Sequence, residues 1–181
     1  FGNAAIGSPL SGNVGYVHVA IRDTNNSFIV DQALCPSTQD TAGQFGQGLA
    51  VSDDGNWLYV GQPGNGAGYV WAYQFNTINN SGASQTLTCD GITTVFVLSG
   101  ELEEPESIYA VKIIGTDGKL LIPFRDYTLS GSTLTFVVAP AAGEAVIFLK
   151  NYYSFVEKIS VPTSTGDQFG YSIATSDDGS Q

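Results

Sequence analysis

Apolar and polar residues alternate along much of this 181-residue chain. An alternation with a period of two places successive side chains on opposite faces of a β-strand, so it predicts strands. Asp-Gly and Gly-rich turns separate the apolar runs, and turns of this kind favour antiparallel hairpins. We find no segment with the helical period of about 3.6 residues. The pattern predicts an all-β protein made of antiparallel strands.

The same pattern occurs more than once. Residues 27–55 read SFIVDQALCPSTQDTAGQFGQGLAVSDDG, and residues 154–179 read SFVEKISVPTSTGDQFGYSIATSDDG. The first copy continues into NWLYVGQPGNGAGYVWAYQF, and the N-terminal sequence AIGSPLSGNVGYVHVAI resembles the end of that continuation. A repeat of about 50 residues is typical of a propeller blade or a similar stacked sheet. We expect the chain to begin within one repeat and to end within another.

Each complete repeat is expected to contribute four antiparallel strands to one sheet. A tight turn at Asp53-Asp54-Gly55 joins the first two, because glycine adopts a positive φ at little cost. The expected strands of the repeats are Gly48–Ser52, Trp57–Gly61, Gly66–Phe75, Ser27–Leu34 and Ser154–Val161, with Ala4–Gly7 and Tyr171–Thr175 in the partial copies.

A second kind of sequence interrupts the repeats. We assign residues 1–76 and 152–181 to the repeats and residues 77–151 to an inserted domain, which begins with a linker-like, Asn- and Ser-rich segment. The insert is expected to form a small β-sandwich. Its candidate strands are Gln85–Thr88, Thr94–Leu98, Ser107–Ile114, Lys119–Pro123, Tyr127–Leu129, Thr133–Val138 and Ala145–Tyr153.

The repeat resembles the FG-GAP repeat of integrin-α-type β-propellers. The resemblance rests on Phe45-Gly46 and Phe169-Gly170, on the Ser-Asp-Asp-Gly turns, and on Val60-Gly61-Gln62-Pro63 followed by Gly68-Tyr69-Val70. It implies four-stranded blades that serve adhesion and protein contacts. Residues 126–136 and 139–144 of the insert resemble small β domains of phage tail-fibre proteins, which implies a fibre context.

The FG-GAP resemblance also raises the question of calcium, because the family often carries a D-x-D-x-D-G loop. The weak candidates here are Asp53, Asp54, Asp177 and Asp178. Calcium takes about six to eight oxygen ligands, and two adjacent Asp side chains in a tight turn point in different directions. We therefore interpret all four as turn formers and expect no metal and no cofactor.

Composition narrows the classes of function. The chain is 43% hydrophobic and 13% charged, with 22 Gly and a net charge of -11, which suits a β-rich extracellular or virion protein. Nucleic acid is not expected as a partner, because phosphate binding needs a basic patch. No apolar run is long enough to span a membrane. Cys35 and Cys89 are interpreted as small buried apolar side chains, although a disulfide between them stays open.

No constellation predicts an enzyme. The single histidine, His18, cannot by itself form a triad or a metal site. The acidic stretch 101–106 is interpreted as a solvated loop rather than a glycosidase pair. The aromatic residues in 57–73 could form a sugar-binding platform, but we interpret them as core residues, because alternation turns half of them toward the interior of the sheet. Two N-x-S sequons make Asn25 and Asn79 candidates for glycosylation.

The incomplete repeats suggest a function. Unpaired strand edges invite pairing, so the C-terminal half-hairpin of one copy is expected to meet the N-terminal strand of the next. The hypothesis is a non-enzymatic structural subunit of an extracellular or virion fibre, whose units are either separate chains or tandem repeats of one longer polypeptide. The alternative is a fragment of an FG-GAP propeller adhesin whose partner is a glycan or a cell-surface receptor. The residues expected to drive self-assembly are Ala4, Ala5, Ile6, Gly7, Tyr171, Ser172, Ile173, Ala174 and Thr175.

Overall fold

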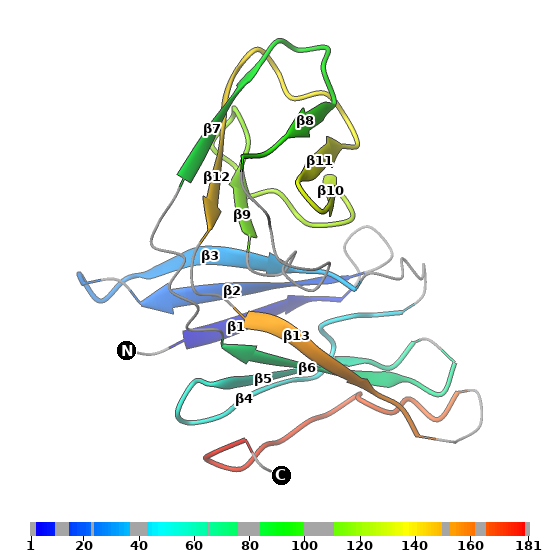
Figure 1. Cartoon of the computed structure of the whole chain (residues 1–181). Coiled ribbons are helices and arrows are strands. Elements are labelled where there is room, and N and C mark those ends of the chain that lie inside the picture. The colour runs from blue at the N-terminus through cyan, green and yellow to red at the C-terminus, as the bar shows by residue number, and fades with distance from the viewer. Residues whose placement is uncertain are drawn as a thin grey trace. The chain divides into compact units, whose positions relative to one another are not determined.

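The computed structural model describes residues 3–9, 15–22, 24–36, 43–64, 66–75, 84–99, 111–149, 153–161 and 166–179. Within these ranges the regular structure is entirely β, without a helix, and every ladder between strands is antiparallel. The all-β prediction is therefore confirmed. The chain divides into two compact units, Phe1–Phe75 with Phe155–Gln181, and Asn76–Ser154 (Figure 1).

The described part of the first unit contains two sheets. One has the order β1-β2-β3 and the other the order β13-β6-β5-β4. The apolar and aromatic residues of β5 and β6 suit strands in the middle of a sheet, and most of these side chains are buried. The bounds are β1 (Asn3–Ser8), β2 (Tyr16–Arg22), β3 (Phe28–Leu34), β4 (Leu49–Val51), β5 (Trp57–Gln62), β6 (Tyr69–Phe75) and β13 (Tyr153–Ile159).

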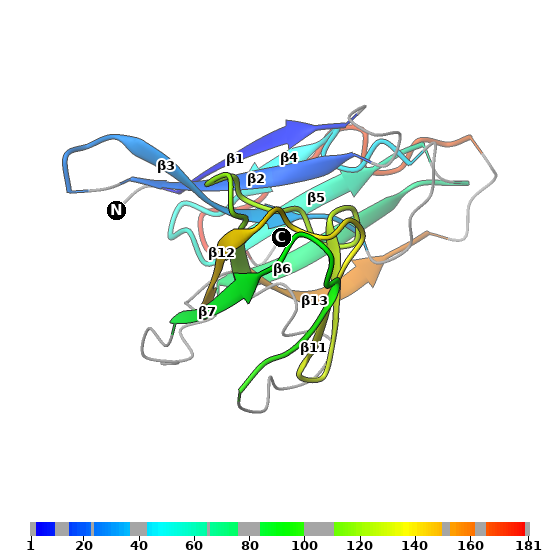
Figure 2. The ribbon, with the colours of Figure 1, turned by 90° about the horizontal axis from the view of Figure 1, so that it is seen from above.

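The two sheets of the first unit stack face to face, as the two views together show (Figure 1 and Figure 2). Leu49 of β4 pairs with Val60 of β5, so both side chains lie on one face. A β-carbon on Gly7 of β1 would lie 3.3 Å from Cδ1 of Leu49, so the β1-β2-β3 sheet covers that face. Phe45 is fully buried there, and its ring meets Trp71 edge-on at 6.0 Å between centroids.

The sequence repeat is also a repeat of backbone conformation. Gln44 and Gln168, the residues before each Phe-Gly, both have a φ of 55°. A non-glycine residue adopts a positive φ uncommonly, so the coincidence at matched positions shows that both copies make the same turn. The glycines at matched positions agree as well: Gly46 and Gly170 at 92° and 85°, Gly15 and Gly68 at 82° and 95°, and Gly55 and Gly179 at 72° and 73°.

Two expected strands are wrong. Tyr171–Thr175 is not a strand, because no strand of the described chain pairs with it, whereas its counterpart β4 pairs with β5. Lys119–Pro123 makes only single bridges, from Leu120 to Ile114 and from Pro123 to Tyr127. A tight turn joins it to the strand that ends at Ile114, with hydrogen bonds from Gly115 N to the Lys119 carbonyl and from Leu121 N to the Ile113 carbonyl. The pairing then stops, because the backbone of Ile122 bonds to Asp126 instead.

Other boundaries in the insert also shift. The expected strand Ala145–Tyr153 is two strands in different sheets, β12 (Gly143–Leu149) and β13. The strand expected at Thr133–Val138 ends at Phe136, because Val137 and Val138 enter a bend. Of the strand expected at Ser107–Ile114, residues 107–110 lie outside the described residues.

In its described residues, the second unit pairs six strands in two sheets of three. Their orders are β7-β12-β9 and β10-β11-β8. The remaining bounds are β7 (Ser84–Cys89), β8 (Val95–Val97), β9 (Val111–Ile114), β10 (Tyr127–Ser130) and β11 (Thr133–Phe136). Alternate residues of β10 and β11 are buried, as period-two patterning requires. Its buried apolar residues include Leu98, Ile113, Ile122, Tyr127, Leu129, Leu134 and Phe136.

Candidate self-assembly surfaces

Segment 166–179 docks through its backbone on the sheet β13-β6-β5-β4, which we call the central sheet. Gly166 N donates a hydrogen bond to the Gly66 carbonyl at 2.7 Å, and Phe169 N donates one to the Ala67 carbonyl at 2.8 Å. A β-carbon on Gly61 would overlap the carbonyl oxygen of Gly170. The segment therefore packs tightly against β5 and β6.

A close backbone contact of the same kind joins the two sheets of the first unit. Gly46 lies against Gly7, and a β-carbon on Gly46 would be 3.3 Å from Cα of Gly7, 3.1 Å from the Tyr16 carbonyl oxygen and 3.0 Å from Cγ2 of Val17. Gly170 meets the matched atoms, namely Cα of Gly61, the carbonyl oxygen of Tyr69 and Cγ2 of Val70. Each Phe-Gly pair thus docks on the preceding sheet in one repeated way.

The Ser-Asp-Asp-Gly turns lie next to each other. Asp54 N donates to the Asp177 carbonyl at 3.4 Å, and the Tyr59 hydroxyl donates to the Gly179 carbonyl at 2.7 Å. The carboxylates of Asp54 and Asp178 accept from the hydroxyls of Ser52 and Ser176 within their own turns. The Ser52 hydrogen bond is the main reason that the pKa of Asp54 lies below its usual value. No group of three or more metal-ligating side chains is found in the described residues.

An open groove lies beside the docked segment. It has a volume of about 510 Å³ and runs between the exposed face of the central sheet and segment 169–174. Burial raises the pKa of Tyr59 at its wall, with a smaller contribution from the charge of Glu157. Its lining is about equally polar and apolar, and it consists of Tyr59, Val70, Glu157, Ile159, Phe169, Gly170, Ser172, Ile173 and Ala174.

β1 has a ladder on one side only within the described chain. It pairs with β2, and its other edge corresponds to the edge of β5 that carries β4. The matched side chains differ sharply in burial, because Val60 is 0% exposed and Ile6 is 54% exposed. Ile6 therefore belongs to a sheet face that is covered in one repeat and uncovered in the other.

The groove and the β1 sheet lie on opposite faces of the central sheet. Neighbouring residues of a strand point to opposite sides, so Val60 and Gly61 face in opposite directions. The β1-β2-β3 sheet covers the Val60 face, and segment 166–179 covers part of the Gly61 face. Within one chain the two surfaces are thus separated by a sheet.

The other residues that the sequence singled out lie in a turn, on strands or in the core, where the structure describes them. Asn25 is exposed in the turn between β2 and β3, and Asn79 lies outside the described residues, as does the acidic stretch 101–106. His18 is half-buried on β2 with its ring 5.0 Å from Tyr16. Trp71 and Tyr73 are buried, whereas Trp57, Tyr59 and Tyr69 are half-buried. Cys35 and Cys89 are buried thiols and form no disulfide.

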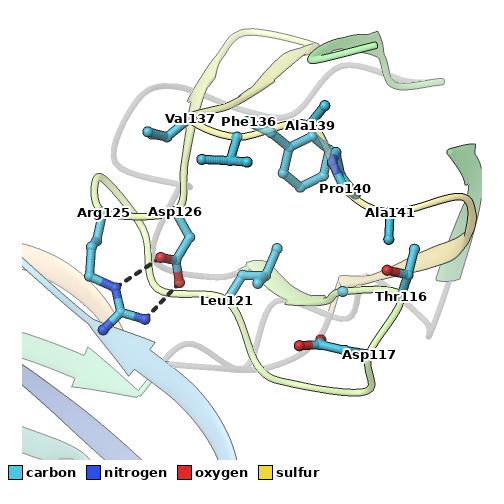
Figure 3. Close-up of a pocket in the computed structure, with 12 residues that line it drawn as sticks. Thr116, Asp117, Leu121, Arg125, Asp126, Phe136, Val137, Ala139, Pro140 and Ala141 are labelled. Atoms are coloured by element: carbon cyan, nitrogen blue, oxygen red, sulfur yellow. Dashed lines mark hydrogen bonds and ion pairs between the residues drawn. The ribbon is translucent and has the colours of Figure 1, made fainter. Parts of the chain in front are cut away.

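The second unit has a cleft of its own, of about 310 Å³ (Figure 3). Leu121, Phe136 and Pro140 form its apolar wall. Its two carboxylates are paired locally: Asp126 with Arg125 at 2.9 Å, and Asp117 with Lys119 at 2.9 Å. The carboxylates are thus held by cations of their own loops, and the cleft offers a mainly apolar surface. Sequence reasoning did not point to it, because its walls come from turns.

Comparisons with family models, curated proteins and solved structures found no match to this chain. In the described residues, no helix has the length and apolar character needed to cross a bilayer.

Proposed function

We propose that this chain is a non-enzymatic structural subunit of an extracellular or virion fibre. Copies join head to tail when the open edge of β1 in one copy pairs with segment 171–175 of another. The observation that carries the proposal is the β4–β5 ladder, which is complete once in the described chain. The same two halves also occur separately, as β1 without a β4 partner and as segment 173–175 without a β5 partner.

The opposite placement of the two surfaces supports an open polymer. A contact between different surfaces of identical subunits is heterologous and extends into a filament unless a rotation closes it. Pairing along an open edge is a known mode of recognition, in which main-chain hydrogen bonds supply affinity. Closed rings would instead favour the alternative, a propeller-type adhesin.

A finer architecture belongs to the same proposal. The sheets would be FG-GAP-like blades, and residues 77–151 an inserted β-sandwich that decorates the outside of the fibre. The repeated Gly7–Gly46 and Gly61–Gly170 contacts support the stacking of blades. The low charge and Gly-rich composition support an extracellular or virion setting, where the exposed Asn25 sequon is open to glycosylation.

The hydrogen-bond pattern of β5 suggests a sharp test. Gly61 N donates to the Gly48 carbonyl, and the Trp57 carbonyl accepts from Ser52 N, so residues 57, 59 and 61 direct their backbone groups toward β4. The matched residue of Tyr59 is Ala5. Ala5→Pro removes an outward N–H, and a proline is tolerated at an edge whose N–H faces solvent.

We expect wild-type protein to form concentration-dependent oligomers by light scattering and negative-stain microscopy, and the Ala5→Pro variant to stay monomeric. Ala5→Ser keeps the N–H and is the matched control, which should assemble like the wild type. Circular dichroism checks that all three are folded. Monomeric wild-type protein at high concentration, or full assembly of Ala5→Pro, would refute the proposal.

A further inference from the structure

We infer that the joint between copies includes face-to-face packing in a defined register, with Phe169 of one copy covering the Ile6, His18 and Phe28 face of the next. The inference rests on the proposed function, because it specifies how the same surfaces meet. The occupant of the exposed face is a second copy of this chain.

The contact between the two sheets of the first unit, which we call the internal joint, shows how such packing works. Phe45 lies between the two sheets of the first unit with 0% exposure, against the ring of Trp71. Trp71 also contacts Phe155 at 5.5 Å between centroids, and Val60 on the same face is fully buried. One Phe-Gly turn thus seals an apolar face formed by β5, β6 and β13.

The β1-β2-β3 sheet carries the matched residues without such a cover. Its residues Ile6, His18 and Phe28 correspond to Val60, Trp71 and Phe155. Ile6 is 54% exposed and Phe28 is 52% exposed. Val30, next to them on the edge strand, is 38% exposed. Ile6 pairs with His18, and Phe28 and Val30 pair with Arg22 and Ala20 of the same strand β2, so the exposed apolar side chains belong to one sheet. Exposed apolar side chains on a sheet are the kind of surface that a partner covers.

The matching cover is Phe169, which lines the groove beside the central sheet. Phe169 is only half-buried, whereas its counterpart Phe45 is fully buried. Val70 also lines the groove, and it is 7% exposed where its counterpart Val17 in the internal joint is 0% exposed. The groove of one copy and the exposed sheet of another are therefore the two halves of the joint that the chain already contains.

The internal ladder fixes the expected register between copies. Leu49 pairs with Val60, Ala50 with Tyr59 and Val51 with Leu58. The corresponding pairs between copies are Ile173 with Ile6, Ala174 with Ala5, and Thr175 with Ala4. Because Gly48–Gly61 and Ser52–Trp57 are hydrogen-bonded pairs, Val51–Leu58 is a non-hydrogen-bonded pair, in which side chains lie closest. The Thr175–Ala4 pair should therefore accept a disulfide.

The experiment is disulfide trapping in the full chain. We expect the double variant Ala4→Cys/Thr175→Cys, mildly oxidised, to give a ladder of covalent multimers that collapses on reduction. Ala4→Cys alone should give at most dimers. The control Ala5→Cys/Thr175→Cys is one residue out of register and should give at least tenfold less multimer, because its two thiols face opposite sides. The native thiols, 2% and 3% exposed at Cys35 and Cys89, should not interfere.

A second experiment tests the packing of Phe169 on the exposed sheet face of the next copy. Phe169→Ala should weaken self-association at least tenfold, measured by sedimentation, while Ile92→Ala, which removes an apolar side chain 83% exposed in the second unit, should not. Assembly that crosslinks equally in both registers, or that ignores Phe169→Ala, overturns this inference and leaves the proposed function standing. An absence of any assembly overturns both, and so does a disulfide that forms only within single chains.

Discussion

Gly61 and Gly170 lie so close that a β-carbon on Gly61 would overlap the carbonyl oxygen of Gly170. Gly7 stands in the same relation to the carbonyl oxygen of Gly46. Both contacts join backbone to backbone across stacked elements, so side-chain size at these positions sets how closely the repeats can approach. The repeat therefore includes both a sheet and the glycine contact by which the next element packs on that sheet.

Gly61→Ala should lower the free energy of unfolding by about 1–3 kcal/mol, because the added methyl forces the docked segment away from β5. Gly66→Ala is the control: its φ is 60°, and a β-carbon there meets nothing within 4 Å. The control therefore suffers backbone strain alone. Urea denaturation measures both, and equal losses in the two variants would contradict the role assigned to the contact.

The two Phe-Gly turns should differ in their effect on the stability of the single chain. Phe45→Ala empties a fully buried site and should cost about 3–5 kcal/mol. Phe169→Ala, at a half-buried site in the groove, should cost clearly less in dilute solution, where copies are apart. Denaturation at low protein concentration measures this, and a larger loss at Phe169 than at Phe45 would be inconsistent with the observed burial.

Stability of the second unit should depend on pH through Asp90. Its carboxylate accepts hydrogen bonds from Thr93 N at 2.7 Å and Ile92 N at 2.8 Å, and the Thr93 contacts are the main reason that its pKa falls from 3.8 to about 2. A pKa lowered by folding means that the charged form stabilises the fold. The stabilisation is complete above about pH 3.8 and is lost as the pH falls through about 2.

Asp90→Asn is the matched variant, because an amide oxygen can still accept these hydrogen bonds but does not titrate in this range. We expect the melting temperature of the wild type to fall more steeply than that of Asp90→Asn between pH 4 and about pH 2. An NMR titration of the side-chain carboxyl carbon checks the midpoint directly. Identical pH profiles for the two proteins would show that Asp90 plays no such role.

Both thiols should be protected in the native protein. Cys35 and Cys89 are almost completely buried, and Cys35 Sγ lies 3.6 Å from the Gly15 carbonyl oxygen as a donor. A thiol reagent should react slowly with native protein and promptly with two equivalents in urea. Rapid native reaction would contradict their burial, and fewer than two equivalents in urea without reductant would indicate a disulfide.

Local structure was predictable where it depends on neighbours in sequence. The strand expected at Trp57–Gly61 is β5, Trp57–Gln62, because alternation and a Gly turn are local signals. Tyr171–Thr175 carries the same signals and is not a strand, because a strand needs a partner as well as a pattern. The groove was not predictable, since its walls come from β5, β6, β13 and a segment that is distant in sequence.

The sequence by itself determined that the chain is β, where its tight turns lie and that a unit of structure recurs, because propensity, alternation and glycine chemistry act over a few residues. Only the tertiary structure decided that Phe45 is sealed between two sheets while Phe169 borders an open groove. The two residues have nearly the same local sequence. What differs is whether a second sheet covers them, and that depends on packing between elements far apart in the chain.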